Sequence, residues 1–157
     1  MKVKKYVTII NPSGAVCLAE CGSYVADGRR VYSSPALLAD FFGNVIGIRQ
    51  AADEHVYIAC LDTKLHIVGC FEASHGCVNY SLFPVREILQ KSLLIGAVSI
   101  VLSHNHPTGD YTPSKQDIEA TKRLKEACNI CGLSLLDHVI VGANNPGYYS
   151  MMEQKSI

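Results

Sequence analysis

The residues best suited to chemistry are two histidines and an aspartate in the segment 104–117. His104 and His106 are two residues apart, so on an extended backbone their side chains point to the same side. Asp117 is expected near the start of the following helix, whose first turn can face back toward the end of the strand. Two imidazoles and one carboxylate suit Zn²⁺ and leave a fourth position for water. This layout is typical of a catalytic zinc site rather than a closed structural one.

A simpler interpretation of the same residues stays open. Ser114 and Asp117 have the spacing of a capping box, in which the aspartate bonds only to backbone near the helix start. A His-x-His pair can also consist of ordinary polar residues that bind no metal. Pro107 and Gly109 restrict the loop after the histidines. On residues and spacing alone, a metal site and a helix cap beside two ordinary histidines remain alternatives.

Other polar residues give weaker signals. Cys128 and Cys131 have ligand-like spacing, but no second Cys-x-x-Cys accompanies them, so helix packing is favoured over zinc or redox use. His138 follows Asp137, and this pair is either a second layer that orients a metal ligand or a structural hydrogen-bonded pair. The remaining histidines lack partner spacing and are interpreted as ordinary polar positions: His55, His66 and His75.

The elements that must position the chemistry follow from hydrophobic patterning. Residues 98–103 are short, β-branched and apolar, which predicts a buried strand directly before the histidines. A helix is expected from Ser114 to about Cys131, where Gly132 stops it. The other expected elements are strands at 55–62, 65–71, 135–141 and 148–152, helices at 36–42 (ended by Gly43) and 85–95, and short strands within 1–32 joined by a turn at 11–14. Strands that alternate with helices predict an α/β or α+β layered domain.

Length and charge limit the function classes. The chain has 157 residues, which predicts a single domain over 1–157, and it shows no linker or repeat. Fourteen Lys and Arg balance fourteen Asp and Glu, so there is no basic excess of the kind that dedicated nucleic-acid binders use. The seven cysteines suit a reducing compartment as small buried hydrophobes. With no apolar run long enough to cross a membrane, we expect a soluble, cytoplasmic protein.

The sequence also resembles a known enzyme superfamily. The pattern H-x-H, seven residues, then S-x-x-D is the signature of the JAMM (JAB1/MPN) metalloproteases, and His104, His106, Ser114 and Asp117 match every position. The RadC-like branch is more similar still, through HNHPTGDYTPSKQD at 104–117 and further blocks at 54–62, 86–87, 135–142 and 148–151. The resemblance covers about residues 34–153, with 1–33 as an extension. Because the helix-hairpin-helix region of long RadC proteins is missing from this sequence, a short, stand-alone form is expected.

The resemblance implies a fold and an activity. It implies a mixed β-sheet flanked by helices, in the JAB/MPN (cytidine-deaminase-like) architecture. It also implies one Zn²⁺ per chain held by His104, His106 and Asp117, and hydrolysis of a peptide or isopeptide bond through a zinc-activated water. In this scheme Glu54 is the general base and Ser114 donates a hydrogen bond to the oxyanion. The partner is then a peptide or protein substrate.

Two assignments keep alternatives. Glu54 is identified as the base only by its strand context, and Glu72, on the returning strand, is its rival, with Glu87 a weaker one. Hydrolysis likewise has an alternative, a non-hydrolytic zinc-binding module associated with DNA repair or other DNA transactions.

Overall fold

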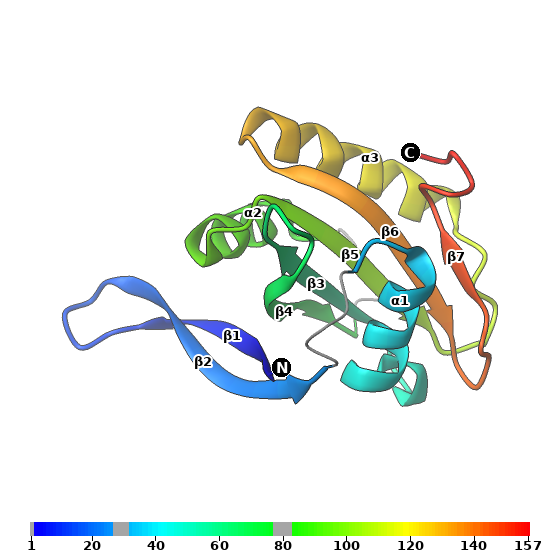
Figure 1. Cartoon of the computed structure of the whole chain (residues 1–157), viewed down its shortest axis with the longest axis horizontal. Coiled ribbons are helices and arrows are strands. Elements are labelled where there is room, and N and C mark those ends of the chain that lie inside the picture. The colour runs from blue at the N-terminus through cyan, green and yellow to red at the C-terminus, as the bar shows by residue number, and fades with distance from the viewer. Residues whose placement is uncertain (1, 27–31, 77–82) are drawn as a thin grey trace.

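The computed structural model describes residues 2–26, 32–76 and 83–157, and its strands form one seven-stranded sheet (Figure 1). The order across the sheet is β2-β1-β4-β3-β5-β6-β7. The strands are β1 (Lys2–Ile10), β2 (Val16–Val25), β3 (His55–Leu61), β4 (Ile67–His75), β5 (Ser99–His106), β6 (Ser134–Gly142) and β7 (Tyr148–Ser150). Residues 27–31 of the expected N-terminal region and residues 77–82, which include one of the seven cysteines, lie outside the described residues.

The sheet is mixed, and its centre positions the histidine segment. β3 runs antiparallel to both β4 and β5, while β5 and β6 are parallel. Parallel neighbours need a crossover connection, which here contains α3 (Lys115–Ile130). The crossover brings the start of α3 back beside the end of β5, as the spacing of His104 and Asp117 requires.

Helices cover both faces of the sheet. One face packs against α2 (Val85–Ile95) and α3, and the other against α1 (Pro35–Asp40) with the π-helix η1 (Phe41–Ile46) and the 3₁₀-helix η2 (Ile48–Gln50). Along β3, Ile58 and Cys60 join the first core while Tyr57 and Ala59 join the second. Two buried faces explain why this strand is almost continuously apolar. The predicted mixed sheet flanked by helices is confirmed.

Several boundaries differ from the sequence expectation: β4 spans Ile67–His75 rather than 65–71, and β7 ends at Ser150 rather than at 152. Two further differences have a clear cause. β5 extends through His106, so both histidines lie on the strand and share one of its faces. The first helical segment does not end at Gly43, because η1 continues to Ile46 and Gly47 ends it with φ 91°. Gly43 lies against Arg49 instead, whose Cδ would be 3.0 Å from a Cβ at this position. This glycine allows a close approach and does not stop the helix.

The N-terminal strands form the expected hairpin, which extends away from the helices (Figure 1). The Asn11 side chain organises its turn by accepting from the backbone N–H groups of Ser13 (3.0 Å) and Ala15 (2.9 Å). β1 joins the rest of the sheet through the pair Lys5 and Cys70, and β2 is an edge strand. Within the described residues, no helix combines the length and apolar character needed to cross a bilayer.

Candidate metal centre

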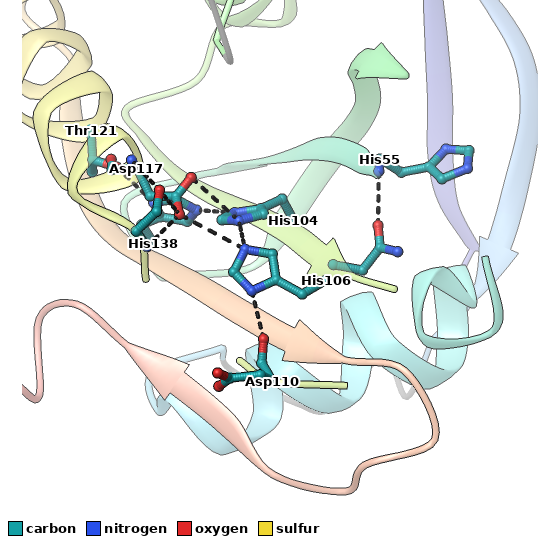
Figure 2. Close-up of polar contacts among 9 residues, drawn as sticks. His55, His104, His106, Asp110, Asp117, Thr121 and His138 are labelled. Carbon is teal, nitrogen blue, oxygen red and sulfur yellow. Dashed lines mark hydrogen bonds and ion pairs between the residues drawn. The ribbon is translucent and has the colours of Figure 1, made fainter. Parts of the chain in front are cut away.

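The site lies where β5 ends, on the face of the sheet that α3 covers (Figure 2). Ile100, Leu102 and His104 alternate along this face, so the apolar run that fixes the strand also directs His104 inward. His104 is buried, and His106, one alternation further, is partly exposed. The two Nε2 atoms lie 2.9 Å apart.

Asp117 reaches the histidines from the first turn of α3. Ser114 is the N-cap, and the two residues form a complete capping box. The Ser114 hydroxyl accepts from the Asp117 N–H at 3.1 Å, and Asp117 Oδ2 accepts from the Ser114 N–H and O–H at 2.7 and 2.6 Å. The cap and the metal site are therefore not exclusive, because the carboxylate that caps the helix also faces the imidazoles.

The three side chains fit a tetrahedral cation. Asp117 Oδ1 lies 3.6 Å from His104 Nε2, and Asp117 Oδ2 lies 3.8 Å from His106 Nε2. Metal bonds of about 2.0–2.1 Å at tetrahedral angles place ligand atoms roughly 3.3 Å apart. The separations of 2.9, 3.6 and 3.8 Å join four atoms, because they involve both carboxylate oxygens of Asp117, and they bracket that value. Side-chain adjustment would bring both imidazole nitrogens and one of these oxygens to zinc-binding distances.

Hydrogen bonds and burial keep the imidazole lone pairs available. His106 Nδ1 lies 2.6 Å from the Asp110 carbonyl oxygen, which can only accept, so Nδ1 carries the proton and Nε2 the lone pair. Burial lowers the pKa of His104 to about 4, opposed by the Asp117 charge and reinforced by His106. His104 is therefore neutral near pH 7, the form in which an imidazole binds a metal.

The three candidate bases lie in different environments. Glu54 is half-buried and directly precedes β3, two residues before Val56, which pairs with His104 on β5. Val56 packs in the core on the face that α2 and α3 cover. Glu72 instead contacts His55, with Oε1 2.6 Å from Nδ1, on the opposite face. Glu87 is exposed in the first turn of α2.

Asn105, between the two histidines, was missed by sequence reasoning. Its side-chain oxygen accepts from the His55 N–H at 2.8 Å, and its amide donates to the Asp53 carbonyl at 2.9 Å. These two bonds hold the backbone on both sides of Glu54. The side chain continues the pairing of β3 and β5 beyond their backbone ladder, a role that sequence spacing does not reveal.

A second group of potential ligands was also missed. His55, Glu72 and His75 bring ligand atoms within 4.8 Å of one another, a proximity that the sequence spacing of these two histidines does not reveal. Their rings stack at 3.9 Å with 24° between the planes. In Figure 2 the His55 ring points away from the main site. Nearly parallel rings direct their in-plane lone pairs alongside one another rather than to one point.

The members of the two pairs singled out in the sequence have different surroundings. The Asp137 carboxylate accepts from the His138 backbone N–H at 2.7 Å, but the two side chains contact different partners. His138 lies beside His104, with Nε2 2.7 Å from His104 Nδ1, whereas Asp137 accepts from Ser150 Oγ at 2.6 Å and holds the chain after β7. Cys128 is buried in the core and Cys131 is exposed after α3. Burial raises the pKa of Cys128 to about 11, which favours the packing role.

Comparison with known proteins supplies the family. The model of the RadC-like JAB domain matches residues 32–156. The chain belongs to this family. Its relatives include UPF0758 proteins of Clostridium novyi (41% identity; 73% of this chain, 51% of the relative), Desulfitobacterium hafniense (36%; 90% and 65%) and Rubrobacter xylanophilus (42%; 80% and 53%). The chain thus spans about half to two thirds of their length. Their names specify no activity.

Proposed function

We propose that this RadC-like JAB domain is a zinc-dependent hydrolase that cleaves a peptide or isopeptide bond in a protein substrate. The observation that carries the proposal is the convergence of three acceptor atoms, from His104, His106 and Asp117, at the end of β5. The superfamily that the chain belongs to includes metalloproteases, which is consistent with this chemistry.

The donor set favours zinc. Two imidazoles and one carboxylate match the ligand sets of catalytic zinc sites. Zinc bound in this way lowers the pKa of a water molecule to about 7 and polarises a carbonyl group. We place one such ion in each chain.

The protein groups divide the remaining work. Glu54, two residues before the β3 partner of His104, is assigned to accept a proton and deliver it to the leaving amine. Ser114 now donates its hydroxyl proton to Asp117 Oδ2. To stabilise an oxyanion it must turn this proton toward the substrate, while its backbone N–H continues to hold the carboxylate.

Two experiments test the proposal, first metal analysis and then hydrolysis of a peptide library. Protein purified without a chelator or His-tag is expected to hold about one zinc per chain, and Asp117→Ala to lose it. Hydrolysis should stop with chelator, return with zinc, and be absent from zinc-loaded Glu54→Gln. Normal turnover by Glu54→Gln would end the assignment of the base.

If the protein binds zinc but cuts no peptide bond, the alternative function is a non-hydrolytic zinc-binding module that acts in DNA transactions. A salt-sensitive shift with DNA would then favour it. The balance of 14 basic and 14 acidic residues gives that outcome no support. A cytoplasmic location is proposed from the free thiols of the six described cysteines.

A further inference from the structure

A buried chain of three hydrogen bonds runs from His104 back to the helix that carries Asp117. His104 Nδ1 lies 2.7 Å from His138 Nε2, His138 Nδ1 lies 2.7 Å from Thr121 Oγ1, and Thr121 Oγ1 lies 2.6 Å from the Asp117 backbone oxygen. All four residues are at most 2% exposed. Figure 2 shows Thr121, His138 and His104 in this succession.

The direction of the chain is set at its Asp117 end. A backbone carbonyl only accepts, so the proton between the two oxygens 2.6 Å apart belongs to Thr121. Having donated its single proton, the Thr121 hydroxyl must accept from His138 Nδ1–H. His138 Nε2 is then unprotonated and must accept from His104 Nδ1–H. The last consequence is that His104 Nε2 carries a lone pair.

We propose that Thr121 and His138 are positioning residues that lock His104 in its Nδ1–H tautomer and so present Nε2 to the metal. The inference rests on the proposed metal site but not on hydrolysis. It gives the buried polar face of α3 two functions: Asp117 supplies a ligand, and Thr121, one turn later, fixes the protonation pattern of another.

Without the Thr121 hydroxyl the chain can reverse. His138 Nδ1 would lose its acceptor, and His138 could carry its proton on Nε2 and donate to His104 Nδ1. His104 would then carry its own proton on Nε2, where it opposes a cation. The hydroxyl of Thr121 therefore sets the tautomer of His104, whereas its methyl group contributes only packing.

Zinc affinity, measured by competition with a chromophoric chelator, tests this distinction. Thr121→Val keeps the shape and removes the hydroxyl, and is expected to weaken zinc binding roughly 10- to 100-fold, the usual effect of losing a group that orients a ligand. Thr121→Ser keeps the hydroxyl and should bind within a few-fold of wild type. Ser103→Ala is the matched control, because Ser103, next to His104 in the sequence, has a buried hydroxyl with no hydrogen-bond partner among the described residues.

The tautomer itself gives a second readout that a merely structural role would not change. In metal-free protein near pH 7, imidazole ¹⁵N NMR should show His104 protonated on Nδ1 in wild type and Thr121→Ser, with a shift toward Nε2–H in Thr121→Val. A wild-type His104 protonated on Nε2 overturns the inference even if the valine variant does not fold. So do equal zinc affinities in the valine and serine variants. Wild-type protein that binds no zinc removes the proposed function, whereas the tautomer still decides the role of Thr121.

Discussion

At the residue scale, hydrogen bonds give each polar atom of the site a fixed role as donor or acceptor. Asp117 Oδ2 accepts hydrogen bonds from the N-cap residue of α3, and the same carboxylate faces two imidazoles. His106 donates its Nδ1–H to the Asp110 carbonyl in the loop that follows β5. The two imidazole nitrogens and the Asp117 carboxylate thereby face one another as acceptors. This arrangement suits a bound cation.

Burial of the histidines predicts how metal-free protein responds to acid. The pKa of His104 falls to about 4 in the folded state, against 6.5 for a free histidine, and burial also lowers that of His138. The unfolded chain therefore binds more protons between these values, so stability is present above pH 6.5 and is lost as the pH falls toward 4. Urea unfolding of chelator-treated protein should give a lower free energy at about pH 5 than at about pH 7. His104→Gln should show a smaller difference, and an unchanged difference would contradict the assignment.

The second histidine group predicts a stoichiometry. Because the rings of His55 and His75 stack and Glu72 is already paired with His55, this group should not retain zinc. His55→Ala and His75→Ala should keep the metal content of wild type, measured by elemental analysis after dialysis. Two zinc ions per wild-type chain, with one lost in His75→Ala, would show that the stacked rings rearrange to bind.

At the element scale, local rules predicted the site and long-range packing completed it. The apolar run before His104, the two-residue alternation and the Ser114 cap are local features, so the sequence could predict that the three candidate ligands lie together. His138 and Thr121 could not be connected to them, because their contacts depend on the register of β6 against β5 and on the rotation of α3 over the sheet. Thr121 shares the buried face of α3 with Leu124 and Cys128, so its spacing alone is typical of a packing residue. Gly43 was misinterpreted because its reason is the distant side chain of Arg49.

The caps of two helices allow a matched comparison of stability. Ser114→Ala removes a bond to the Asp117 N–H and a donor to the Asp117 carboxylate, so it should lower the free energy of unfolding by about 1–2 kcal/mol. Ser34→Ala removes one longer cap bond, 3.4 Å to the Leu37 N–H, and should cost about 0.5 kcal/mol. Denaturant titration of metal-free protein measures both. A larger loss at Ser34 would mean that the capping box contributes little.

At the scale of the whole molecule, the site lies in the best-connected part of the sheet. β5 is paired on both sides, with β3 and β6, and both of its faces are covered. The N-terminal hairpin begins before residue 32, where the family match starts, and ends in an edge strand that extends from the body. The candidate metal site and the exposed edge strand thus lie in different parts of one sheet.

Hydrogen exchange should resolve these two parts. Amides in the outer half of the hairpin are held only by the pairing of β1 with β2, so they can open without disturbing the core. Amides of β5 and β6 can exchange only when the central sheet opens. Mass spectrometry of deuterated peptides should therefore show fast exchange across residues 6–20 and slow exchange across 99–106 and 134–142. Adding zinc should slow exchange at the end of β5 and the start of α3 and leave the hairpin unchanged. Equal protection of the hairpin and β5 would indicate one cooperative unit, and the hairpin would then contribute to the stability of the metal centre.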